Sequence, residues 1–446
     1  MGRALWLKIA ALAGLAAALL IPLQLIQSKI EEREATRAGV VRELANTSVG
    51  EQTLSGPLLV MPCTEHYFVE EKDGRGVVNR EPRTRDCTRS HVPEALAVSG
   101  ALTTESRHRG IYSARFFSGT FEFKGRFVVK PPEPAAPDVT RAWGAPLLVV
   151  SLRDVRGIRN APVLTWNGAQ HGFESGAAPG AKGAGIHAAV GATGAAPLAG
   201  THTFSFPIEI AGLQSLAFVP SARQHQVALS ASWPHPSFVG RHLPVTREIT
   251  SAGFTATWRL SELASEAPRT MKACGDPGCK ALENYAFGVK LVDPVDVYVQ
   301  ANRAVKYALL FVLLTFAGFF LFEILRDLRI HPVQYGLVGL ALAIFFLLLI
   351  ALSEHIAFVY AYVAAAGACV GLIAVYLSAV LRSALRAAGF AAMLTALYMM
   401  LYALLRSEDH GLLLGALLVF AALAAIMLLT RRVDWYGAGG SESRSK

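Results

Sequence analysis

The chain has 446 residues, of which 53 % are hydrophobic and only 17 % are charged. Soluble globular proteins average roughly 45–50 % apolar and about 25 % charged residues. This composition excludes a disordered chain, a fibrous repeat and a simple cytosolic enzyme. The net charge of +9 is scattered, without a dense basic stripe interleaved with aromatic residues, so we expect no nucleic-acid partner.

Charged residues concentrate between 28 and 303, whereas the flanking parts have the composition of membrane segments. Six apolar runs are each long enough to cross a bilayer as a helix. They comprise residues 4–26, 304–325, 332–352, 356–381, 387–405 and 411–430. No small-x-small cleavage site follows the first run, so we predict an uncleaved signal anchor over 1–27 rather than a cleaved secretory signal.

The loops between the runs predict an orientation, because cytoplasmic loops are enriched in Lys and Arg. Basic pairs follow the second, fourth and sixth runs, at Arg326 and Arg329, Arg382 and Arg386, and Arg431 and Arg432. The alternate loops are richer in acidic residues and histidine. We therefore expect both termini in the cytoplasm, an exported domain over 28–303, a five-helix membrane domain over 304–430 and a cytoplasmic tail over 431–446.

The exported part begins with a predicted continuation of the first helix that ends near Asn46. Beyond it, short β-branched and aromatic segments broken by Gly and Pro predict a mainly-β domain of sandwich type. Residues 119–129 and 201–210 alternate polar and apolar side chains, as half-buried strands do. We expect a seam between two packed modules near 131–137, and a flexible surface loop in the Gly/Ala-rich tract 172–200.

Four of the five cysteines fall in the exported part, where an oxidising compartment allows disulfides. A Pro-Gly turn separates Cys274 from Cys279, which favours a local bridge and leaves Cys63 to pair with Cys87. The other pairings and a four-thiolate zinc site are the alternatives. Cys369 lies inside the fourth run and is interpreted as a packing residue.

The sequence contains no standard catalytic motif, so we assign no catalytic residue and expect no cofactor or metal. The histidines of the β-rich part are His202, His225, His235 and His242. We interpret them as ordinary surface or loop histidines, with a metal or carbohydrate site as the alternative.

Ionisable residues in the membrane part are candidates for function, because burying them in a bilayer is costly. Glu323 lies near the inner end of the second run, where an ion pair with Arg326 is the simplest account. The other candidates lie at the ends of runs and are His331, Glu354, His355, Asp409 and His410. Adjacent carboxylate and imidazole groups could relay protons or bind a metal, although ordinary polar loops have the same composition.

Two small-residue motifs, Gly367-x3-Gly371 and Gly411-x3-Gly415, predict close helix packing within the chain or between chains. They support a packed bundle and say little about function.

Long motifs of the chain resemble the CreD family of inner-membrane proteins. They are "DPVDVYVQANRAVKYALLFVLLTFAGFFLFE" (293–323), "HPVQYGLVGLALAIFFLLLIALSEH" (331–355), "LTRRVDWY" (429–436), and, in the exported part, "SWPHPSFVGRHLP" and "GFTATWRL". The resemblance implies a Gram-negative inner-membrane protein with a large periplasmic domain, linked to envelope stress, a two-component response and β-lactam damage. It supplies no catalytic residues.

Two functions remain open at this point. The first is a non-enzymatic protein of cell-envelope integrity, embedded in membrane lipids, whose β-rich domain binds periplasmic or outer-envelope proteins or glycan. The second is a transporter or membrane-embedded enzyme that uses Glu323, Glu354 and His355. Against the second, the runs lack the Gly/Pro interruptions typical of transporter sites. The oligomeric state is left open.

Overall fold

The computed structural model describes residues 3–72, 78–177, 183–194, 196–293, 297–325, 330–407 and 411–431. The chain divides into two compact units. A helical unit comprises residues 1–38 and 295–446, and a β unit comprises residues 39–294. Ile30 and Ala301 are buried in the core of the helical unit, so this unit includes residues on both sides of the predicted membrane segments; the exported domain over 28–303 stays a prediction.

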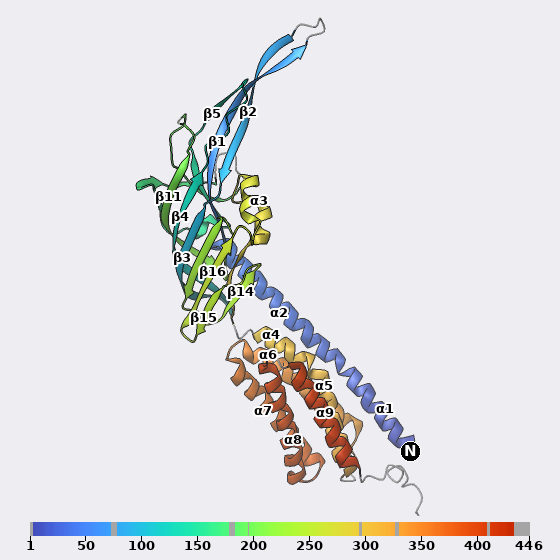
Figure 1. Ribbon diagram of the computed structural model, residues 1–446. Helices are drawn as coiled ribbons and strands as arrows, with labels where there is room; N and C mark the ends of the chain where they lie inside the picture. Colours follow the sequence, from blue (N-terminus) through green and yellow to red (C-terminus); the bar gives the residue numbers. More distant parts are fainter. Residues whose placement is uncertain are drawn as a thin grey trace, which may run out of the picture. The chain divides into compact units, whose positions relative to one another are not determined.

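The helical unit contains the apolar helices (Figure 1). Their bounds are α1 (Arg3–Ala18), α2 (Leu20–Thr47, which continues into the β unit), α4 (Val297–Lys306), α5 (Ala308–Leu325), α6 (Pro332–Ser353), α7 (Phe358–Val380), α8 (Ala384–Arg406) and α9 (Gly411–Thr430). Among the described residues, five helices are long and apolar enough to cross a membrane, or six if the bent pair α4–α5 forms one span. Helix α6 is the best buried of these spans and lies at the centre of the unit's core.

The second predicted span is not continuous. It breaks between α4 and α5, whose axes differ by 44°. At the break the Tyr307 N–H donates to the Ala304 carbonyl at 3.1 Å, a tighter i−3 bond than an α-helix makes. The run predicted as one span over 304–325 is therefore divided at Tyr307, although no Gly or Pro marks this break in the sequence.

The β unit is a sandwich of two sheets, which confirms the predicted fold class. Its elements are β1 (Gln52–Lys72), β2 (Val78–His91), β3 (Ala95–Arg109), β4 (Tyr112–Val129), β5 (Val139–Trp143), β6 (Leu147–Leu152), η1 (Val155–Gly157), β7 (Val163–Trp166), β8 (Ala169–Gly172), β9 (Glu174–Ser175), β10 (Gly185–Ala189), β11 (Gly200–Leu213), β12 (Ser215–Phe218), β13 (Gln224–Ala231), β14 (Pro236–Gly240), β15 (Thr246–Thr250), β16 (Gly253–Ser261), α3 (Ala267–Cys274), η2 (Lys280–Tyr285) and β17 (Phe287–Leu291).

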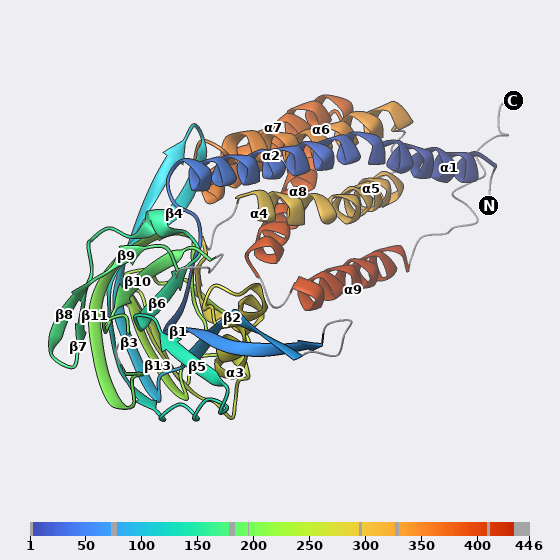
Figure 2. The ribbon, with the colours of Figure 1, turned by 90° about the horizontal axis from the view of Figure 1, so that it is seen from above.

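The two sheets have different strand orders. The first runs β14-β17-β12-β1-β6-β10-β9, with β2 and β5 also paired to β1, and the second runs β15-β16-β13-β3-β4-β11-β7-β8. Figure 2 shows β11, β3 and β13 in one layer and β10, β6 and β1 in the other. Strands from both halves of the sequence alternate between the sheets, so residues 131–137 connect β4 to β5 from one sheet to the other and are not a seam between modules.

The Gly/Ala-rich tract was predicted to be a flexible loop, and the structure corrects this for its middle. Strand β10 pairs with β6, so that Ile186 faces Val150 and Ala188 faces Leu148 across the ladder. Ile186 and Ala188 are buried in the sandwich core. Strand β10 is thus held by its ladder with β6 and by apolar side chains at alternate positions.

Aromatic residues at alternate positions of β4 and β11 build the core between the sheets. Phe123 and Phe206 stack with ring centroids 4.9 Å apart, and both are buried. At position 100 of β3 only glycine fits, because a Cβ there would lie 2.4 Å from the Phe121 ring. Burying each such ring contributes about 1.5–3 kcal/mol, so this aromatic layer is a main source of the unit's stability.

Candidate functional site

A polar cluster lies inside the helical unit around the carboxylate of Glu323, near the end of α5. Lys8 of α1 forms an ion pair with Glu323 Oε1 and also donates to the Ile330 carbonyl at 3.0 Å. The Ile330 N–H donates to Glu323 Oε1 at 3.1 Å, and the Tyr335 hydroxyl of α6 donates to Oε2 at 2.8 Å. Both carboxylate oxygens are therefore hydrogen-bonded, by donors from three separate segments.

This arrangement neutralises the buried charge and ties the first helix to α5 and α6. The partner expected from the sequence, Arg326, lies outside the described residues. Lys8 lies within the first apolar run and was not among the candidate residues. A lysine within an apolar run, together with one acid in a distant run, was the signal that could have indicated the pair.

A second polar group lies at the other end of α6, around Glu354. The Tyr298 hydroxyl of α4 donates to Glu354 Oε1 at 3.2 Å, and Arg33 Nε of α2 lies 3.6 Å from the same oxygen. Only 9 % of the Glu354 side chain is exposed. Its neighbour His355 is exposed. The structure thus surrounds Glu354 with a phenol and a guanidinium, rather than with the adjacent imidazole.

Of the remaining ionisable candidates, the structure describes His331 only. His331 is the N-cap of α6, where its Nδ1 accepts from the Val333 N–H at 3.3 Å and the Gln334 side chain accepts from the His331 N–H. Asp409 and His410 lie outside the described residues. Among the residues that the structure does describe, no group of three His, Cys, Asp or Glu side chains could hold a metal ion.

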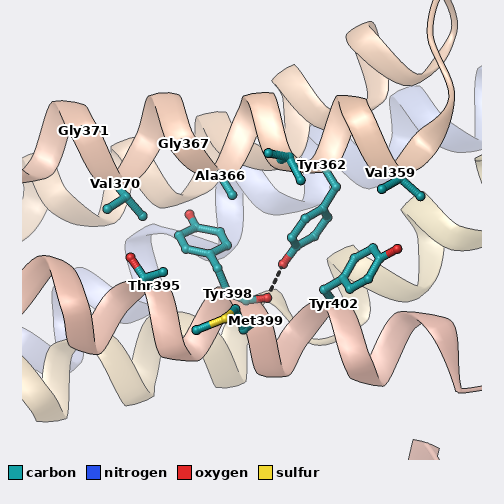
Figure 3. Close-up of a pocket in the computed structure, with 11 residues that line it drawn as sticks. Val359, Tyr362, Ala366, Gly367, Val370, Gly371, Thr395, Tyr398, Met399 and Tyr402 are labelled. Carbon is teal, nitrogen blue, oxygen red and sulfur yellow. Dashed lines mark hydrogen bonds between the residues drawn. The ribbon is translucent and has the colours of Figure 1, made fainter.

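An apolar groove of about 760 Å³ lies between α7 and α8 (Figure 3). Two of its tyrosines are hydrogen-bonded within the bundle: the Tyr362 hydroxyl donates to the Tyr398 carbonyl at 2.7 Å, and the Tyr398 hydroxyl donates to Cys369 Sγ at 3.1 Å. Val370 and Met399 supply apolar walls. The groove can accommodate hydrocarbon, and the described residues offer it no acid, base or metal ligand.

The two small-residue motifs behave differently. At Gly367 and Gly371, which line this groove, no described atom from another helix lies within 4 Å of where a Cβ would be, so no other helix of the described chain packs closely there. At Gly411 the Tyr307 hydroxyl lies 3.4 Å from that position, and at Gly415 the Tyr307 ring lies 4.0 Å away. The second motif therefore receives a side chain from the α4–α5 break, and not a helix backbone.

In the β unit, the four cysteines form the disulfides Cys63–Cys87 and Cys274–Cys279. The first joins directly opposite residues of β1 and β2. Two residues further along β1, Glu65 accepts from Arg85 at 2.7 Å and from Arg141 at 2.6 Å. These bonds, from Arg141 first and then Arg85, hold the pKa of Glu65 below its usual value.

The histidines of the β unit are spread over it. His202 stacks on Trp166, and His235 meets Trp233 edge to face. His225 is buried, with its ring edge on Phe287, and burial lowers its pKa from 6.5 to about 3. The interpretation as surface histidines was therefore wrong for His225, which is a core residue.

Arg115 of β4 connects two of the sequence motifs within the β unit. Its guanidinium lies 3.8 Å from the Trp233 ring centroid and pairs with Asp293 at 2.7 Å. The Trp233 indole N–H donates to the Val292 carbonyl at 3.0 Å. Residues at the end of the β unit are thereby fixed against β4, a contact that no local sequence pattern indicated.

The apolar helices and the β sandwich together define a multi-pass membrane protein with a large β unit inserted between its first and second membrane segments. Residues 4–436 match the family described as inner membrane protein CreD. The chain is 36 % identical over 440 residues to the inner membrane protein CreD of Escherichia coli (strain K12), covering 97 % of this chain and 94 % of that protein. The chain belongs to the CreD family, which confirms the resemblance and identifies it as an inner-membrane protein.

Proposed function

We propose that this protein supports cell-envelope integrity and the envelope-stress response by binding envelope components through its β unit on the periplasmic side. Both termini then lie in the cytoplasm. Binding is the activity that we assign to the β unit.

The observation that carries the proposal is the pair of disulfides in the β unit. Disulfides persist in the bacterial periplasm and are rare in the cytosol. The basic loops that follow the second, fourth and sixth apolar runs favour the same orientation. A β sandwich held outside the membrane by flanking helices is then positioned to contact periplasmic proteins or glycan.

The alternative of transport or catalysis in the helix bundle has weaker support. The broken α4–α5 helix is a feature of some transporters. However, the carboxylate of Glu323 already accepts hydrogen bonds from Lys8, Ile330 and Tyr335. A carboxylate with these partners is suited to holding helices together. We therefore propose a structural role for Glu323.

Complementation of a strain that lacks this gene, challenged with detergent and a β-lactam, tests the proposal. Three forms are compared: the wild type, the double variant Glu354→Gln/His355→Ala, and a chain lacking residues 48–293. Membrane fractionation verifies that each form inserts. We expect the double variant to rescue growth and the shortened chain to fail.

The reverse result, in which the inserted double variant fails and the shortened chain rescues, would assign the function to the helical unit. The disulfides offer an independent check on orientation. A membrane-impermeant thiol reagent, added to whole cells after mild reduction, should label the cysteines of the β unit and leave Cys369 unlabelled.

A further inference from the structure

An open trough of about 800 Å³ lies on the outer face of the second sheet of the β unit, over β3, β4, β13 and β16. Alternate residues of a strand point to opposite faces. Val98, Phe123 and Val227 point into the sandwich core. Their sequence neighbours therefore point outward, and the strand register determines which of them lie side by side in the trough.

Two rows of outward residues cross the strands. The register aligns Arg259, Gln226, Ala97 and Lys124 in one row, and Ser261, Gln224, Ala95, Arg126 and Thr203 in the next. The two alanines lie on β3, between strands that carry long side chains. Ala95 and Ala97 thus form the floor, and amide and basic side chains form the walls on both sides.

The trough is basic. Lys124, Arg126 and Arg259 are exposed, and no acidic residue lines it. Lys124 lies 3.5 Å from Glu122, whereas Arg126 and Arg259 have no ion-pair partner in the described part of the chain. Three strand spacings separate Arg259 from Lys124, which places their backbones about 14 Å apart. Two arginines are therefore available to bind an anion on either side of the floor.

We propose that this trough binds an anionic glycan, a chain of sugars that carry carboxylate or phosphate groups. The inference rests on the proposed function and names the ligand class and the site. Guanidinium groups bind carboxylate and phosphate in bidentate fashion. The amides of Gln224 and Gln226 both donate and accept, as sugar hydroxyls require. No Phe, Tyr or Trp of the described residues lines the trough, so charge and hydrogen bonding supply the affinity.

A peptide fits this surface less well than a glycan. Extended peptides bind sheets by adding a strand to an edge with free backbone groups. Here β3 is paired on both sides, to β4 and β13, and β13 is paired to β3 and β16. The trough therefore offers side-chain groups only, and those are the groups that a hydroxyl-rich polyanion can use.

Binding to the full-length protein in lipid nanodiscs tests the inference by calorimetry. The probes are tetragalacturonate, which carries carboxylates, a phosphorylated tetramannoside, and neutral maltotetraose. We expect saturable binding of one or both anionic probes, weakened by added salt, and none of maltotetraose. The stronger of the two anionic probes identifies the acidic group that the trough recognises.

Substitutions locate the site. Arg126→Gln/Arg259→Gln removes two charge-assisted contacts and should weaken binding by at least about tenfold. Ala97→Phe fills the floor without changing any charge and should weaken binding similarly, which general electrostatic attraction would not explain. Arg89→Glu, an exposed position on β2 of the other sheet, is the matched control and should bind as the wild type does. Unchanged thermal unfolding shows that each variant is folded.

The inference is overturned if neither anionic probe binds, if Arg89→Glu is as weak as the Arg126/Arg259 variant, or if a glutamate tetrapeptide binds more tightly than the glycans. These outcomes are separate from failure of the proposed function. Suppose that no glycan binds and that the chain lacking residues 48–293 still fails in complementation. The β unit is then required for function, and only the proposed ligand is wrong.

Discussion

In the helical unit the carboxylate of Glu323 is neutralised by Lys8, of which only 22 % of the side chain is exposed. In the β unit the carboxylate of Glu65 is neutralised by Arg141, at 12 % exposure, and by Arg85, at 64 %. Both acids are nearly fully covered, but one of the two cations around Glu65 reaches water. The contrast indicates that a charge inside the bundle depends on each of its partners, whereas water can replace part of the set in the β unit.

Loss of Lys8 is expected to have the largest effect and would sharpen this contrast. Lys8→Met leaves the Glu323 carboxylate without its cation, and breaking a buried pair in this way costs about 3–5 kcal/mol. Unfolding in mixed detergent micelles measures it. Lys8→Met/Glu323→Gln should recover much of the loss. If Lys8→Met is no more destabilising than Arg85→Ala in the β unit, the two environments do not differ as argued.

The disulfides provide the next largest effect, and only in the β unit. Cys63–Cys87 closes a loop with a sequence separation of 24, and Cys274–Cys279 one of 5. Because loop-closure entropy grows with length, removing the first by Cys63→Ser/Cys87→Ser should cost about 3.5 kcal/mol, and removing the second about 2 kcal/mol. Denaturant unfolding with and without reductant measures both. Equal losses would show that loop length does not govern the stabilisation.

Acid should weaken the β unit through His225. The ring is buried beside Phe287, and its Nδ1 accepts from the Ser221 N–H at 3.3 Å. Its pKa falls from 6.5 to about 3 in the folded state. Between these two pH values the imidazole is protonated in the unfolded chain and neutral in the folded chain. The free energy of unfolding therefore decreases as pH falls from 6.5 toward 3, by about 1.4 kcal/mol per pH unit.

The measurement is the denaturant midpoint of tryptophan fluorescence between pH 4 and pH 7. His225→Leu should lose this part of the slope, while His108→Gln, at an exposed position of β3, should retain it. A wild-type slope that persists in His225→Leu would assign the acid sensitivity to carboxylates instead.

The difference between local and distant contacts explains what the sequence could predict. Long apolar runs and the alternation in 119–129 and 201–210 depend on neighbouring residues, and they predicted the helices and the sandwich correctly. Lys8 and Glu323 are 315 residues apart, and no local pattern links a residue of the first apolar run to one of the second. The helix break at Tyr307 carries no Gly or Pro, so composition gave no sign of it.

The β unit shows the same limit at a smaller scale. Strand β10 was missed because Ile186 is its only large apolar residue and the surrounding tract is rich in Gly and Ala. The strand depends on the ladder with β6. The basic trough was missed for a related reason. Its residues come from strands that are distant in sequence, and only the register places Arg126 near Gln224 and Arg259 near Gln226.

His331 offers the smallest predicted effect and tests the helical unit where its polar contacts are local. The side chain caps α6 by accepting from the Val333 N–H, and Gln334 completes the capping box. Replacing an N-cap acceptor by Ala costs about 1 kcal/mol, so His331→Ala should lower stability by that amount in the same micelle unfolding experiment. His331→Asn keeps an acceptor and should restore most of it. If His331→Ala lowers the free energy of unfolding as much as Lys8→Met does, His331 contributes more than its cap. If the decrease is small, a strong dependence of stability on one partner is limited to the buried Lys8–Glu323 pair.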